Sequence, residues 1–121
     1  STVDKAYGNR DCQMYADQYE LLARPDIDAV LIATGDRWHT PLSIIAAQHG
    51  KDVYCEKPCS MSIEESWALA QAFQRYNRLY QAGCQRRNGA NFRLCRELLQ
   101  EGALGKLTAL YANVGPSVNW P

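Results

Sequence analysis

A lysine at the end of a short apolar segment is the residue in this chain that is best placed for chemistry. Residues 53–58 read Val-Tyr-Cys-Glu-Lys-Pro, so an apolar stretch runs into Glu56 and Lys57 and stops at Pro58. In a parallel α/β sheet, ligands bind just beyond the carboxyl ends of the strands. We therefore interpret Lys57 as an ammonium group that rigid backbone holds at the edge of a cleft. The alternative, favoured by the local pattern alone, is a solvated Glu-Lys pair.

Three short apolar runs predict the strands that position this motif, at residues 28–34, 52–55 and 79–83. Near-continuous apolar runs are typical of strands that helices cover on both faces of a parallel sheet. Helix patterns lie before and between the runs. Residues 11–24 contain a short extended stretch and then a helix, which Pro25 ends.

The next two helices have recognisable ends. Thr40 and Pro41 supply an N-cap and a first-turn proline, and Gly50 stands at the usual stop position, with Leu42, Ile45, Ala46 and His49 on one face. Ser62 and Glu65 form a capping box, and the helix they begin turns an apolar stripe inward, made of Trp67, Leu69, Phe73 and Tyr76. The order of elements predicts an α/β fold, a doubly wound parallel sheet with right-handed crossovers.

The character of the chain changes after Gly83. Residues 84–90 are polar and basic, as in a linker between layers or domains. A helix follows that ends at Gly102 and has Phe92, Cys95, Leu98 and Leu99 on one face. The alternation in residues 107–114 predicts a half-exposed strand.

Composition excludes several classes of protein. Thirteen acidic residues balance thirteen basic ones, which favours neither nucleic acid nor an anionic membrane as a partner. No apolar run approaches the roughly 18 residues of a membrane helix, and the first residues lack the apolar stretch of a signal peptide. We expect a cytoplasmic protein. The chain does not begin with methionine, which suggests that it is cut from a longer one.

The five cysteines indicate a reducing compartment, because an odd number at scattered spacings does not suit a disulfide scaffold. Cys55 and Cys59 flank the Glu-Lys-Pro turn, and a metal or redox site there is one reading. Zinc ligands usually come in pairs two residues apart, and no such pair is present. We interpret Cys55 as a small buried residue at the end of a strand and predict no metal site.

Together these segments resemble the Gfo/Idh/MocA oxidoreductase family, which includes glucose-fructose oxidoreductase, inositol dehydrogenase and many sugar dehydrogenases. The resemblance runs from about residue 15 to residue 105 and rests on landmarks in the family's order: Asp26-Ile-Asp-Ala-Val-Leu-Ile-Ala-Thr34, His39, Gly50-Lys-Asp-Val, Glu56-Lys-Pro58 and Gly83-Cys-Gln-Arg-Arg87. The Trp38-His39 pair and Tyr54-Cys-Glu-Lys-Pro58 are similar to a large bacterial branch of the family.

The resemblance implies a Rossmann domain followed by an α/β domain with an open, mostly antiparallel sheet. Residues 1–87 would be the C-terminal half of the Rossmann domain, beginning inside the helix after its second strand, and residues 88–121 would begin the substrate and oligomerisation domain. No Gly-x-Gly-x-x-Gly phosphate loop occurs in the sequence, and the family's downstream catalytic Asp and His are absent. The resemblance therefore implies an internal fragment, inactive alone, of an NAD- or NADP-dependent enzyme.

The resemblance also implies roles for single residues. The loop after the first strand of this chain would line the cofactor cleft through Thr34, Gly35, Asp36, Trp38 and His39, although the family often has proline where Gly35 stands. Glu56 and Lys57 would contact the nicotinamide ribose, and Lys57 would also reach the substrate hydroxyl. Gln85 stands where many members have asparagine, and Arg86 or Arg87 would lie near the cofactor or the domain junction.

Hydride leaves a carbinol carbon only as the hydroxyl proton is lost, so such an enzyme needs a desolvated lysine or one that stabilises a developing alkoxide. Each role has an alternative. His39 could cap the following helix, His49 could pack at the end of its helix, and Arg86 and Arg87 could form a solvated turn.

Two classes of function remain. The first is an oxidoreductase, acting on a sugar, polyol or related carbohydrate and expected to be a homo-oligomer. The second is a non-catalytic dinucleotide- or sugar-binding relative that serves as a sensor or partner subunit. Lys57 favours the enzyme, because a binding protein does not need it.

Overall fold

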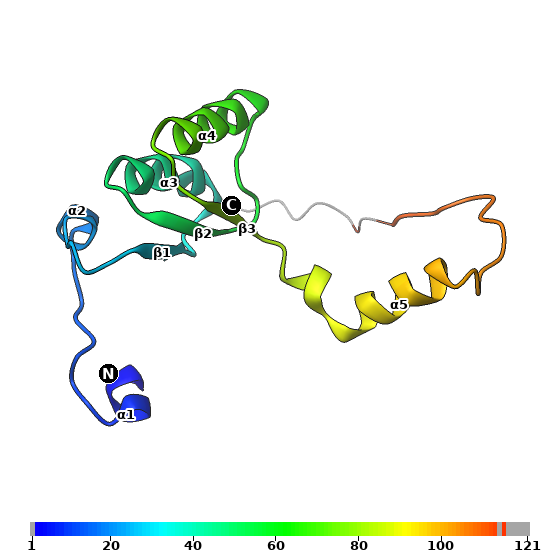
Figure 1. Cartoon of the computed structure of the whole chain (residues 1–121), viewed down its shortest axis with the longest axis horizontal. Coiled ribbons are helices and arrows are strands. Elements are labelled where there is room, and N and C mark those ends of the chain that lie inside the picture. Colours follow the sequence, from blue (N-terminus) through cyan, green and yellow to red (C-terminus); the bar gives the residue numbers. More distant parts are fainter. Residues whose placement is uncertain (1, 114, 116–121) are drawn as a thin grey trace. The chain divides into compact units, whose positions relative to one another are not determined.

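Three parallel strands form the sheet of the computed structural model, which describes residues 2–113 and 115 (Figure 1). They are β1 (Ala29–Ile32), β2 (Asp52–Glu56) and β3 (Tyr80–Gly83), and they lie side by side in that order. The register places Ile32 beside Cys55 and Cys55 beside Ala82. All three predicted strands are therefore present, and β1 lies at an edge of the sheet.

Two helices, α3 (His39–Gln48) and α4 (Ile63–Arg75), cover one face of this sheet (Figure 1). Buried residues from both layers form a single core, namely Leu22, Ile32, Ala46, Ala47, Val53, Cys55, Leu69 and Phe73. Side chains of successive strand residues point to opposite faces. Leu31 and Gln81 are exposed on the other face, so within residues 2–84 helices cover only one face of the sheet. The expectation of cover on both faces is wrong for this part of the chain.

Helix α4 confirms its predicted start and corrects one predicted core residue. Ser62 is the N-cap, and its hydroxyl accepts a hydrogen bond from the backbone N–H of Glu65. Leu69 and Phe73 are buried as predicted, whereas the Trp67 side chain is 66% exposed. Each residue of a helix advances about 100°, so Trp67, two positions before Leu69, points away from the sheet.

Helix α3 begins differently from the prediction. A short 3₁₀ turn, η1 (Asp36–Trp38), precedes it, and Trp38 occupies the N-cap position without a side-chain capping bond. Thr40 is therefore not the N-cap but lies inside the first turn. The predicted stop is confirmed, because Gly50 has a φ of +74°, which suits glycine after a helix.

His49 is the C-cap residue of α3, and its exposed ring does not belong to the core. Its Nδ1 donates to the carbonyl oxygen of Ile45 at 2.9 Å. The ring centre lies 6.0 Å from that of Tyr19. The predicted partnership with the helix C-terminus is confirmed, and the predicted place on the buried face is wrong.

The N-terminal segment contains two short helices, α1 (Thr2–Tyr7) and α2 (Gln18–Leu22). The first agrees with the helix that the family resemblance implied at the start of the chain. The second follows an extended stretch, as predicted for residues 11–24, and its N-cap Asp17 accepts a hydrogen bond from Tyr19 N–H. The carbonyl oxygens of Arg24 and Ile27, between α2 and β1, accept hydrogen bonds from the buried Lys51 ammonium at 2.6 and 2.7 Å.

The described residues from Gln85 onward form a second compact unit. It contains a 3₁₀ turn, η2 (Gln85–Asn88), and α5 (Ala90–Gln100), which confirms the predicted helix. Every side chain of α5 is exposed, including its predicted apolar face. Residues 107–113 form no strand, so that prediction is wrong for them, and Val114 lies outside the described residues. A strand needs a partner for its backbone hydrogen bonds, and none of the described residues of this unit provides one.

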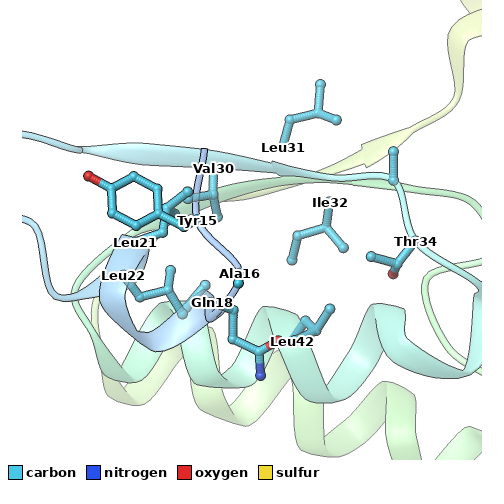
Figure 2. A pocket seen from close by; sticks show the side chains of 12 residues that line it. Tyr15, Ala16, Gln18, Leu21, Leu22, Val30, Leu31, Ile32, Thr34 and Leu42 are labelled. Atoms are coloured by element: carbon cyan, nitrogen blue, oxygen red, sulfur yellow. The ribbon is translucent and has the colours of Figure 1, made fainter. Parts of the chain in front are cut away.

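An open pocket of about 310 Å³ adjoins β1 on the face that the helices cover (Figure 2). Apolar side chains from α2, β1 and α3 dominate its lining, among them Leu21, Val30, Ile32 and Leu42. Leu31 extends from β1 away from α3 (Figure 2). No helix among the described residues is long and apolar enough to cross a membrane.

Candidate functional site

The carboxyl ends of the strands bring the sequence-predicted residues Glu56 and Lys57 to one edge of the sheet. Glu56 is the last residue of β2 and is half-buried, and Lys57 follows it with an exposed side chain. The ammonium group of Lys57 makes no hydrogen bond or ion pair with any described residue. Among the described residues, its exposed side chain is not in the desolvated position that we considered. Its charge is free to meet a ligand at this edge.

Gly83 ends β3 directly beside Glu56. A Cβ atom built on Gly83 would lie 3.0 Å from the carbonyl oxygen of Cys55, 3.1 Å from Glu56 Cα and 3.3 Å from Glu56 Cδ. Contacts this short require the neighbouring atoms to move, so only glycine leaves the Glu56 side chain where it is. The position of Glu56 thus depends on the residue type at 83.

The loop after β1 contributes a second group of predicted residues. Thr34, Gly35 and Asp36 are exposed, and the Trp38 side chain is 50% exposed. The guanidinium carbon of Arg37 lies 5.9 Å from the centre of the Trp38 ring. This loop therefore presents a hydroxyl, a carboxylate and an aromatic face, which are groups that can contact a ribose or a planar ring.

His39 behaves differently from the rest of that loop. Its side chain is only 1% exposed, and each ring nitrogen meets a backbone carbonyl oxygen. Nδ1 lies 2.7 Å from the oxygen of Pro58, and Nε2 lies 3.1 Å from the oxygen of Thr34. These contacts occupy the polar atoms of the ring, so they favour a role inside the protein over direct contact with a ligand.

Thr40 and Glu65 contact the same stretch of chain after β2. The Thr40 hydroxyl lies 3.0 Å from the carbonyl oxygen of Cys59 and 3.3 Å from Oε2 of Glu65. The same Oε2 accepts a hydrogen bond from the backbone N–H of Met61 at 2.7 Å. The Glu65 carboxylate therefore does not complete the predicted capping box by accepting from the backbone N–H of Ser62. It accepts from the N–H of Met61 instead.

Behind this edge lies a buried group of two thiols and a phenol. Cys55 is fully buried, as predicted, and Cys59 and Tyr80 pack partly buried against the core. Burial, with the thiols of Cys55 and Cys59 next, raises the pKa of the Tyr80 phenol. The phenolic oxygen has no hydrogen-bond partner of ordinary geometry in the described part of the chain, and thiols are weak partners. Among the described residues, no cluster of His, Cys, Asp and Glu could hold a metal ion.

Gln85 and Arg86 are exposed residues of η2, in the second unit of the chain. The proposed contact of these two side chains with the cofactor stays a prediction, as does the division into domains at residues 87 and 88.

Sequence reasoning assigned Thr40 and Glu65 only to helix ends. Thr40 contacts Cys59, 19 positions along the chain, and Glu65, 25 positions along it. The contact of Glu65 with Met61 spans only four positions. A polar pair at the starts of two successive helices, near the end of the intervening strand, was the available signal.

Comparison with known proteins agrees with this geometry. A family model described as an oxidoreductase family with an NAD-binding Rossmann fold matches residues 2–84. The chain is 36% identical over 90 residues to scyllo-inositol 2-dehydrogenase (NAD(+)) of Bacillus subtilis, covering 74% of this chain and 26% of that protein. It is 29% identical over 118 residues to 2,7-anhydro-N-acetylneuraminate hydratase of Mediterraneibacter gnavus, covering 91% of this chain and 31% of the relative.

A solved structure of an NAD-binding protein from Listeria innocua superimposes with a TM-score of 0.76 at 30% identity. The match covers 87% of this chain and 30% of that one. The chain thus spans about a third or less of the length of these relatives. The matched family model, the parallel sheet and the residues at its carboxyl edge lead to one conclusion: the chain belongs to the Gfo/Idh/MocA oxidoreductase family, whose fold is an NAD-binding Rossmann fold.

Proposed function

We propose that this chain is part of an NAD- or NADP-dependent oxidoreductase that transfers hydride between the nicotinamide cofactor and a sugar, polyol or related carbohydrate. The observation that carries the proposal is the exposed side chain of Lys57, which has no hydrogen bond or ion pair with any described residue and follows the carboxyl end of β2 beside Glu56. A protein that only binds a dinucleotide does not need a cation at that point.

The residues at this edge suit the cofactor. Thr34, Gly35, Asp36 and Trp38 would hold it on one side of the sheet edge and Glu56 on the other, and Gly83 leaves the space that a Cβ would fill against Glu56. The nicotinamide ring supplies the hydride acceptor or donor. We assign no pyrophosphate contact to this chain, because it contains no Gly-x-Gly-x-x-Gly motif.

Lys57 would act on the oxygen of the reacting carbon. When a secondary alcohol is oxidised, the C–H bond gives up a hydride, the O–H bond loses its proton, and the C–O bond becomes a carbonyl. Negative charge grows on the oxygen if the proton departs early. A fixed cation within reach of that oxygen stabilises this charge more strongly in the transition state than in the bound alcohol, which raises turnover.

The names of the relatives support the proposed substrate class. Myo-inositol 2-dehydrogenase of Thermotoga maritima is 32% identical over 92 residues, so a second relative is named for a cyclic polyol. The relative from M. gnavus is named as a hydratase and not as a dehydrogenase. We propose a polyol or sugar substrate for the whole protein, in a cytoplasmic homo-oligomer.

Replacing Lys57 by methionine in the whole protein tests the proposal. Lys57→Met keeps the length of the side chain but removes its charge, so we expect turnover to fall about 100-fold or more. The dissociation constant for NADH, measured by fluorescence, should change by less than several-fold. Lys106→Met, which removes an exposed lysine of the second unit, is the matched control.

Two results would count against the enzyme. Unchanged turnover in Lys57→Met would remove the catalytic role of this lysine. A wild-type protein that binds NADH but oxidises no sugar or polyol with NAD⁺ or NADP⁺ would instead be the non-catalytic binding relative.

A further inference from the structure

The chain that follows Lys57 is held by side chains rather than by backbone pairing. Residues 58–61 belong to no helix or strand, and they take part in none of the backbone–backbone hydrogen bonds of the described chain. Three of their backbone polar groups nevertheless meet side chains of the described residues. The carbonyl oxygens of Pro58 and Cys59 accept from His39 and Thr40, and Met61 N–H donates to a carboxylate oxygen of Glu65.

These contacts come from the first residues of two helices. His39 and Thr40 open α3, and Glu65 lies in the first turn of α4. The starts of helices that pack on the same sheet are rigid supports, because the core fixes both helices. We call the three side chains the loop clamp.

His39 connects the clamp to the loop after β1. One of its ring nitrogens meets the carbonyl oxygen of Pro58 and the other that of Thr34. A carbonyl oxygen only accepts, and a neutral imidazole has one N–H to donate, so both hydrogen bonds form together only in the doubly protonated ring. In either form, the ring lies between the two loops in which the proposed cofactor and substrate contacts are found.

Burial makes these contacts hard to replace. His39 is 1% exposed and Thr40 is 4% exposed, so a side chain that loses its carbonyl partner has little access to water as a replacement. The carbonyl oxygens of Pro58 and Cys59 are partly buried, so the loss of their donors is costly, and the loop relieves that cost by moving toward water. Because Pro58 directly follows Lys57, such a movement changes where the Lys57 backbone lies.

We propose that the loop clamp, His39 and Thr40 with Glu65, is a set of positioning residues that fixes Lys57 relative to the loop after β1 without touching the substrate. The proposal rests on the catalytic role of Lys57 proposed above. A displacement of about 1 Å in a catalytic group is enough to lower a rate about 100-fold. The clamp is thus expected to act on turnover more than on cofactor affinity.

Thr40 offers the cleanest test, because two substitutions separate its hydroxyl from its methyl group. In the whole protein, Thr40→Val removes the hydroxyl and keeps the shape, and Thr40→Ser keeps the hydroxyl. Ser43→Ala is the matched control: Ser43 is also a buried hydroxyl of α3, but it donates to the carbonyl oxygen of His39 within the helix. Turnover and KM are measured with myo-inositol and NAD⁺, and amide exchange of residues 57–62 by mass spectrometry.

We expect Thr40→Val to lower kcat about tenfold or more, to change KM for NAD⁺ less than threefold, and to speed amide exchange in residues 57–62. Thr40→Ser should restore kcat to within about twofold of the wild type, and Ser43→Ala should leave kcat unchanged. Wild-type kcat and exchange in Thr40→Val would overturn the proposal. An equal loss of kcat in all three variants would also overturn it, because it would indicate a general effect on stability.

Two further arms keep the outcome decisive. If Thr40→Val does not fold, Glu65→Ala replaces it, since Glu65 is only half-buried, and the same losses are expected. If the wild-type protein oxidises neither myo-inositol nor other polyols with NAD⁺ or NADP⁺, the proposed function fails. The exchange measurement then still decides on the clamp: faster exchange in Thr40→Val but not in Thr40→Ser supports it, and equal exchange in both overturns it.

Discussion

The two histidines of the chain show how one residue type takes two roles in the same helix. His39 begins α3, is buried, and meets the carbonyl oxygens of Thr34, in the loop just before the helix, and of Pro58, 19 positions along the chain. His49 caps the C-terminus of the same helix, is exposed, and donates to Ile45 one turn earlier. Helical position alone predicts the second role, because that contact is local. The first depends on Pro58, which only the packed sheet brings within reach.

Tyr80 gives a residue-scale prediction that does not depend on the proposed function. Its ring packs edge-on against Phe73, with ring centres 5.0 Å apart, and its hydroxyl is buried without a hydrogen-bond partner by ordinary geometry. Tyr80→Phe keeps the ring and removes the unsatisfied hydroxyl, so we expect the free energy of unfolding of the whole protein to rise by about 1 kcal/mol. Urea denaturation at pH 8 measures it.

The same substitution has a defined dependence on pH. Burial and the nearby thiols of Cys55 and Cys59 raise the pKa of Tyr80, whereas in the unfolded chain a tyrosine ionises near about pH 10. The contribution of Tyr80 to stability is therefore fully present below pH 10 and is lost as the pH rises toward the folded pKa. Tyr80→Phe should lose less stability than the wild type between pH 8 and pH 10.5. A less stable Tyr80→Phe at pH 8 would show that the hydroxyl makes a useful bond.

At the scale of elements, the pairing of β2 and β3 connects strand packing to the candidate site. Gly83→Ala would bring a Cβ within 3.0 to 3.3 Å of the Cys55 carbonyl oxygen and of two Glu56 atoms. We expect the strand ends to separate by a few tenths of an ångström, with a loss of about 1–3 kcal/mol in stability and a several-fold weaker affinity for NADH. Gln81→Ala, at an exposed position of β3, is the control. Wild-type affinity in Gly83→Ala would indicate that Glu56 does not contact the cofactor.

The strands and helices that were predicted correctly are those that local sequence patterns determine. All three strands follow from apolar runs, and α4 follows from the spacing of Leu69 and Phe73 and the Ser62 cap. The errors concern contacts across the fold. Thr40 looks like an N-cap, but its hydroxyl meets Cys59, in the loop after β2, and Glu65, in α4. The strand predicted near residue 107 lacks a partner among the described residues.

The candidate site was predictable to a similar degree. Glu56 and Lys57 lie at a strand end, where a strand pattern and the fold rule for parallel sheets place them. The roles of the clamp residues were harder to predict, because the sequence shows that a side chain is polar but not which carbonyl oxygen it meets. The steric role of Gly83 depends on register with Glu56, and a one-residue change of register would remove it.

For the whole molecule, the open edge of β1 is the feature with the largest consequence. β1 pairs only with β2 in the described chain, and Leu31 on its uncovered face is 68% exposed. On the opposite face of β1, the one that the helices cover, the open apolar pocket also leaves apolar side chains beside the strand in contact with solvent (Figure 2). An edge strand with free N–H and C=O groups and apolar side chains tends to pair with another chain.

The chain of 121 residues, produced alone, should therefore self-associate and melt without a sharp transition. It should also bind NAD without useful affinity, because it has no phosphate-binding glycine motif. A charge on an edge strand opposes pairing, so Leu31→Lys should shift the chain toward the monomer in size-exclusion chromatography, whereas Leu107→Lys, at an exposed leucine of the second unit, should not. A sharp monomer peak, a cooperative melt and micromolar NAD binding by the unchanged chain would together mean that its sheet needs no further strand.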